Sequence, residues 1–272
     1  MNGVVFNETL RRGWRTALYW GIGLAVYALY IIMVFGADDA SRAQMADIMA
    51  TKMPGFLGQI FGIPEDASFL LSTAGFLSFA YFTYSALMLA VWAVLTGLSV
   101  TANDEESGVL NMLMALPLAR WRLVVERIAA NIVLLIGIAI GSLLGILVAL
   151  IMIPAPDVAL GGLIAALFGM MLLVSVIMAV TVLLSVLVKR RGTAAALAGA
   201  FVAVSFLLNT LGGAAQSSVG DVLRNFSVFY HFDSAGIIQN GLALGSVTVL
   251  MTALVAITWG AVYLFQRRDL GG

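Results

Sequence analysis

The sequence predicts an all-α integral membrane protein with six transmembrane helices and both termini in the cytoplasm. Of its 272 residues, 62% are hydrophobic and 10% are charged. Soluble domains average about 25% charged and about 45–50% apolar residues. A soluble core of this length could not bury so many apolar side chains, so most of the chain must face lipid. Six long uncharged runs and a one-sided distribution of basic residues support the same fold class.

The first predicted transmembrane helix covers residues 16–35, which carry no charge. It is longer than the apolar region of a signal peptide and lacks a small-residue cleavage site, which predicts a retained span. Residues 4–15 before it place Phe6, Leu10 and Trp14 at four-residue spacing. This pattern indicates either a short amphipathic helix lying in the membrane interface or a charged flank of the first span. The sequence leaves both open.

The other predicted spans cover residues 75–100, 128–153, 158–188, 193–211 and 242–265. A helix needs about 20 residues to cross a hydrocarbon core about 30 Å thick. Only residues 193–211 fall slightly short of that length, and the polar Lys189–Gly192 break separates them from the preceding span. We therefore predict a single transmembrane domain over residues 1–272.

Orientation follows from the basic residues, which concentrate in cytoplasmic segments of membrane proteins. With the N-terminus in the cytoplasm, the inner segments hold Arg11, Arg12, Arg15, Arg120, Arg122, Arg127, Lys189, Arg190, Arg191, Arg267 and Arg268. The outer segments hold only Arg42, Lys52 and Arg224. This bias predicts that both termini are cytoplasmic.

Two segments on the outer side are long enough to have structure of their own. Residues 36–74 predict a helix around 40–51 and a second apolar helix over 54–64, lying on the outer leaflet. Residues 212–241 begin with a Gly-Gly turn and are rich in aromatic residues. They predict a half-inserted helix pair packed against protein, because a lipid-exposed irregular backbone would be too costly. A plain extracytoplasmic loop is the alternative.

Small residues recur every fourth position in two spans. Gly137, Gly141 and Gly145 form one series, and Ala195, Gly199 and Ala203 form the other. Such residues let two helices approach closely. Packing within one subunit is favoured over a seam between two copies.

The predicted spans contain no side chains typical of catalysis or ion coupling. No predicted span interior holds Asp, Glu, Lys, Arg or His, whereas ion-coupled carriers and pumps need ionisable groups at membrane depth. The sequence has no cysteine, no Gly-rich phosphate loop and no basic, aromatic tract typical of nucleic-acid binding. The single histidine, His231, has only Asp233 nearby and is expected to be structural. We predict no catalytic residue, no metal site and no cofactor bound by this chain.

The densest charge lies in the predicted cytoplasmic hairpin, residues 101–127. Three acids, Asp104 to Glu106, stand where negative charge favours a helix start, and Asn103 or Asp104 can cap it. An apolar helix too short to span follows, Pro117 ends it, and a second helix over 118–127 leads into the third span. The hairpin is either a turn resting on lipid headgroups or a helix that inserts Leu and Met side chains into a groove of a cytosolic protein.

Here the sequence resembles a known family. Glu105-Glu106-Ser107-Gly108-Val109-Leu110, followed by Leu116-Pro117-Leu118-Ala119-Arg120, resembles the acid–Gly–Thr–Leu … Pro–Val–Ser–Arg signature of type-2 ATP-binding-cassette (ABC) exporter permeases. Glu126-Arg127 stands where the family has Gly-Lys, and Val109 and Leu118-Ala119 replace the hydroxyl-bearing positions. Residues 227–233 resemble the family's Ser-Pro-Phe segment, with Val228 in the place of proline. The six-span layout and the large first outer loop agree along essentially the whole chain.

The resemblance implies a permease that pairs with a separate cytosolic ABC ATPase, two copies of each forming an exporter. ATP and Mg²⁺ would be bound by the ATPase, and the permease, a homodimer in a prokaryotic plasma membrane, would not be an enzyme. Residues 104–117 would form the coupling helix. The expected contacts to the ATPase come from Glu105, Glu106, Gly108, Leu110, Leu113, Met114, Pro117 and Arg120. The uncharged spans favour an amphipathic substrate, such as a drug, a lipid-like molecule or a peptide.

Two other functions use the same hairpin. A membrane anchor or maturation factor could dock a cytosolic enzyme without moving a substrate. An intramembrane enzyme could act on lipid headgroups through Asp104 to Glu106, although three adjacent acids on a helix splay apart and cannot converge on one cation.

Overall fold

The computed structural model describes residues 3–36, 72–103, 119–153, 158–188, 190–214 and 218–267. Regular structure in these ranges is entirely helical, and six helices are long and apolar enough to cross a membrane. They cover Val4–Val34, Thr73–Val100, Trp121–Met152, Leu160–Leu187, Arg191–Gly213 and Leu244–Arg267. The predicted all-α membrane fold with six spans is confirmed. The helices expected over 40–51 and 54–64 lie outside the described residues.

The first span begins earlier than the uncharged run suggests. Helix α1 is continuous from Val4 to Gly36, so residues 4–15 extend the first span and do not form a separate interfacial helix. Helix α8 likewise runs without interruption from Arg120 to Met152. The charged flanks are therefore continuous helical extensions of the membrane helices.

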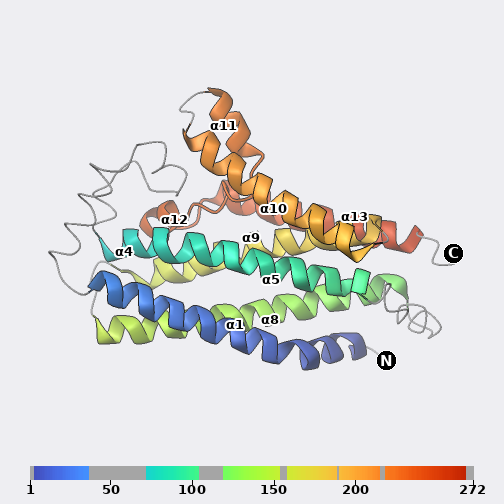
Figure 1. The fold of residues 1–272 in the computed structure, drawn as a ribbon, viewed down its shortest axis with the longest axis horizontal. Helices are drawn as coiled ribbons and strands as arrows, with labels where there is room; N and C mark the ends of the chain where they lie inside the picture. The colour runs from blue at the N-terminus through green and yellow to red at the C-terminus, as the bar shows by residue number, and fades with distance from the viewer. Residues whose placement is uncertain are drawn as a thin grey trace.

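Helices α1 and α8 lie side by side along their length and run in the same direction (Figure 1). Glycines allow this close approach: a Cβ atom added to Gly141 would lie 3.1 Å from the Cα of Gly21, and one added to Gly145 would collide with Ala25. Two members of the first small-residue series thus serve packing within the subunit, as the sequence favours.

Helix α9, Leu160–Leu187, is the centre of the bundle. It packs against α5 (Tyr84–Val100), α10 (Arg191–Ala214) and α13 (Leu244–Arg267). Of its most apolar stretch, 72% is buried inside the chain, against 11% for α13. Because α9 is apolar on every face, protein surrounds it, whereas α13 is left mostly to lipid or to another subunit.

The second span contains a wide turn. It consists of α4 (Thr73–Phe76), the π-helical segment η3 (Leu77–Thr83) and α5. Ser72 caps its start by accepting a hydrogen bond from the backbone N–H of Gly75 at 2.9 Å. The shift to π-helical pairing leaves backbone carbonyls of this segment available to other partners.

The segment before the last span forms two short helices, α11 (Ser218–Asn225) and α12 (Ser234–Asn240). Helix α11 packs on α10, and α12 packs on α9 and η3 (Figure 1). A Cβ added to Gly169 would meet Ile237 and Phe232 at 3.0 and 3.3 Å. Gly169 lies nine residues into α9, about 14 Å along its axis. Helix α12 therefore packs against α9, whereas half-insertion of the 212–241 segment into the membrane stays a prediction.

Candidate functional site

The predicted contact residues of the hairpin fall almost entirely outside the described residues. Glu105, Glu106, Gly108, Leu110, Leu113, Met114 and Pro117 belong to residues 104–118, which the structure does not describe. Arg120 is the first residue of α8, and its side chain is not described. What the structure provides is the frame that carries the hairpin, from Asn103 on one side to Ala119 on the other.

On the α8 side, Glu126 holds the beginning of α1. Its carboxylate accepts hydrogen bonds from the backbone N–H groups of Gly3 and Phe6, at 3.4 and 3.2 Å. The first N–H groups of a helix have no partner within the helix, and negative charge there complements the helix dipole. Glu126 thereby ties the beginning of α8 to the beginning of α1.

The next residue, Arg127, holds the end of α5. Its Nη1 atom donates to the backbone carbonyls of Ser99 and Val100, at 3.1 and 2.7 Å. The last carbonyls of a helix are likewise unpaired, and a cation stabilises that negative end. Glu126 and Arg127, with the backbone groups they contact on α1 and α5, are called the Glu126–Arg127 bridge below.

A further hydrogen bond extends this frame to the central helix. The hydroxyls of Thr101, just after α5, and Ser185, near the end of α9, lie 2.6 Å apart, and both residues are fully buried. The chain is helical again at Ala102 and Asn103, the last described residues before the hairpin. The Oδ1 atom of Asn103 is buried and has no hydrogen-bond partner among the described residues. The start of the hairpin is thus anchored to two spans.

Sequence reasoning missed the bridge. Glu126-Arg127 stood out only as a departure from the Gly-Lys pair of the family that the sequence resembles. The available signal was an acid directly followed by a base at the start of a span, where they can reach two helix ends of opposite polarity. The hydrogen-bond partners of these side chains are backbone groups of α1 and α5. Every residue has such groups, so the sequence cannot indicate which ones are contacted.

A second polar cluster lies around η3, near the start of the second span. Tyr27 of α1 donates to the carbonyl of Ala80 at 2.6 Å, and Ser234 of α12 donates to the carbonyl of Ser78 at 3.1 Å. The hydroxyls of Tyr81 and Ser142 lie 2.6 Å apart. Side chains from α1, α8 and α12 thus meet the π-helical turn. Tyr27 and Ser234 satisfy backbone carbonyls of this turn, whereas Ser142 contacts the side-chain hydroxyl of Tyr81.

His231 lies beside α12 and lines a small cavity of about 260 Å³ with Asp233 and Asn240. Its ring contacts that of Tyr230 edge-on, with centroids 5.4 Å apart. Asp233 caps α12 by accepting from the backbone N–H of Gly236 at 3.0 Å. Within the described ranges, no three His, Cys, Asp or Glu residues gather closely enough to hold a metal ion.

Among the described residues, hydrogen bonds thus join the ends of α1, α5, α8 and α9 next to the two ends of the 104–118 segment. A family model described as an ABC-2 family transporter protein matches residues 5–270. The chain belongs to the ABC-2 transporter family. A search of curated proteins finds no match. An ABC-2 chain is a multi-pass transmembrane permease of an ABC transporter, and membership implies association with an ATP-binding subunit.

Proposed function

We propose that this chain is the permease subunit of an ABC exporter, and that its 104–117 helix couples ATP hydrolysis in a separate cytosolic subunit to movement of the spans. The observation that carries the proposal is the Glu126–Arg127 bridge. It attaches the hairpin's returning arm to the ends of α1 and α5. A hairpin that only rested on lipid headgroups would not need to be attached to the ends of two other spans.

The energy must come from a partner. No predicted span interior contains Asp, Glu, Lys, Arg or His, the side chains through which proton- and sodium-coupled carriers usually work. A ligand shifts a conformational equilibrium only through its different affinities for the two states. In this proposal ATP and Mg²⁺ bind one conformation of the ATPase more tightly than the other. The resulting change in the ATPase is transmitted to the permease through its contact with the hairpin.

The contact to the ATPase is assigned to the short apolar helix. Leu110, Leu113 and Met114 would fill a groove of the ATPase, as amphipathic helices do in many complexes. Glu105, Glu106 and Arg120 would form the charged rim, Gly108 would allow close backbone approach, and Pro117 would end the helix.

The frame supplies the route from the hairpin into the membrane. A displacement of the hairpin moves α8 directly, and the bridge requires the ends of α1 and α5 to follow or to lose charge-assisted hydrogen bonds. The Thr101–Ser185 hydrogen bond adds α9. The proposed motion is a shift of packed helices in which each bridge contact is either kept or broken.

The exporter would contain two permease copies. Helix α10 offers a face for a second copy, because Gly199 and Ala203 are exposed and a Cβ added to Gly199 would meet no atom within 4 Å. Small residues at this spacing favour close packing between helices. A pathway lined by uncharged spans would suit an amphipathic substrate. The exporter would lie in a prokaryotic plasma membrane.

The test is co-purification with the ABC ATPases of the same genome, tried one at a time. The variant Glu106→Lys with Leu113→Asp should reduce ATPase recovery about tenfold or more, as loss of a central contact does, while membrane insertion stays normal. The matched control, Asp221→Lys with Val222→Asp on exposed α11, makes the same charge changes and should leave recovery unchanged. Undiminished recovery by the hairpin variant would contradict the proposal.

A further inference from the structure

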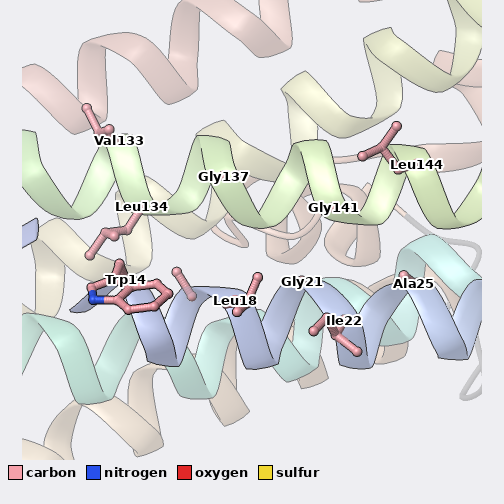
Figure 2. Close-up of a pocket in the computed structure, with 11 residues that line it drawn as sticks. Trp14, Leu18, Gly21, Ile22, Ala25, Val133, Leu134, Gly137, Gly141 and Leu144 are labelled. Carbon is pink, nitrogen blue, oxygen red and sulfur yellow. The ribbon is translucent and has the colours of Figure 1, made fainter. Parts of the chain in front are cut away.

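An apolar groove of about 460 Å³ runs between α1 and α8 on the outside of the bundle (Figure 2). Helix α1 contributes Trp14, Leu18 and Ile22 to it, and α8 contributes Val133, Gly137 and Leu144. Every lining residue is aliphatic, aromatic or glycine. The groove is separate from the hairpin frame and is not used by the proposed coupling.

The groove exists because the two helices touch at small residues and Gly137, beside this contact, has no side chain. Gly141 meets Gly21 closely, whereas a Cβ added to Gly137, one turn earlier on α8, would find no heavy atom within 4 Å. The missing side chain at Gly137 leaves the floor of the groove open. Leu18 and Ile22, along the wall, are 50% and 53% exposed. The described residues therefore leave this space unfilled.

The length of the groove matches one leaflet of a bilayer. From Trp14 to Ala25 it follows α1 for 11 residues, about 16 Å along the axis. That is about half of a hydrocarbon core about 30 Å thick. The uncharged run begins at Thr16, so the groove occupies the half of the membrane nearest the basic end of α1. A single acyl chain fits this depth.

The mouth of the groove is positively charged. The guanidinium of Arg15 lies over the ring of Trp14, 5.5 Å from its centroid, and among the described residues no carboxylate is within ion-pair distance of Arg15. One turn earlier, Arg11 and Arg12 share the single carboxylate of Glu8, at 3.1 and 2.6 Å. An arginine held at the membrane surface with unused donors is suited to a phosphate.

We propose that this groove binds an anionic phospholipid of the leaflet on the Arg15 side, with one acyl chain along Gly137 and the headgroup phosphate at Arg15. A second permease copy fits less well. A two-fold axis normal to the membrane would bring the same residues together at the same depth, which places one basic mouth against another. A lipid anion neutralises that charge.

Native mass spectrometry of the full-length protein in detergent tests the site, with phosphatidylglycerol and phosphatidylcholine of identical acyl chains as probes. Wild type should retain phosphatidylglycerol preferentially. Arg15→Gln should weaken its retention about fivefold, the contribution of one basic residue at a membrane surface. Retention of phosphatidylcholine should weaken less, because the choline cation offsets the charge of the phosphate that both lipids carry. Gly137→Leu should weaken retention of both lipids about tenfold, because the new side chain displaces methylene groups from the floor.

The matched control is Gly260→Leu on α13, where an added Cβ also meets no atom within 4 Å. It should retain lipid as wild type does. Equal retention of the two lipids by wild type, or unchanged retention by Gly137→Leu, would overturn the proposal. Loss of permease dimers in Gly137→Leu with lipid retention unchanged would assign the groove to a second copy instead.

Discussion

At the scale of single residues, the adjacent side chains of Glu126 and Arg127 join the beginning of α8 to two other helices. Each satisfies backbone groups that a helix end cannot satisfy alone, and they reach helix ends of opposite polarity. The sequence predicts a hairpin with an apolar helix, which lies outside the described residues, and it did not predict the role of this pair. Such hydrogen bonds depend on which helices pack together, and that packing cannot be predicted from a single sequence.

The first prediction concerns Arg127. Arg127→Gln removes charge-assisted hydrogen bonds to Ser99 and Val100 and should destabilise the folded protein by about 1.5–3 kcal/mol. Arg127→Lys keeps a cationic donor and should retain most of that stability. Thermal unfolding in detergent, followed by tryptophan fluorescence, measures both.

Arg191→Gln is the control, because Arg191 is an exposed arginine at the start of α10. It should unfold as wild type does. In proteoliposomes of the permease–ATPase complex, Arg127→Gln should also hydrolyse ATP with weaker dependence on the permease's substrate. Wild-type unfolding by Arg127→Gln would show that the bridge does not hold α5.

At the scale of elements, the six spans were predictable because an uncharged run of about 20 residues is rare outside transmembrane helices. Their ends were not. Helices α1 and α8 continue through charged flanks because long side chains can reach water from a helix that leaves the membrane. The π-helical turn of η3 was also unpredictable, since a one-residue shift in hydrogen bonding leaves the apolar composition of 75–100 unchanged.

The second prediction concerns the contact between α1 and α8. Gly145→Val places a branched side chain against the backbone of Ala25, and overpacking of this kind costs about 1–3 kcal/mol or more. The variant should show a lower unfolding temperature and a smaller monodisperse peak in size-exclusion chromatography. Gly260→Val, which adds the same side chain in open space on α13, should behave as wild type.

At the scale of the whole molecule, the choice of helix partners could not be predicted. Helix α9 is apolar on every side, so no polar face indicates which neighbours surround it. The pairing of α1 with α8 depends on small residues that recur elsewhere in the chain. Assignment to the ABC-2 transporter family, by contrast, was accessible from the hairpin signature and the six-span layout.

The central claim is that the 104–117 helix contacts the ATPase. The chain has no cysteine, so Leu113→Cys provides one site for a benzophenone label, and Val219→Cys on exposed α11 provides the control. After illumination of the assembled complex, the account predicts a permease–ATPase adduct from the label at 113, with a yield that changes when ATP is added, and none from the label at 219. An absence of adduct from 113 in a complex that remains assembled would contradict it.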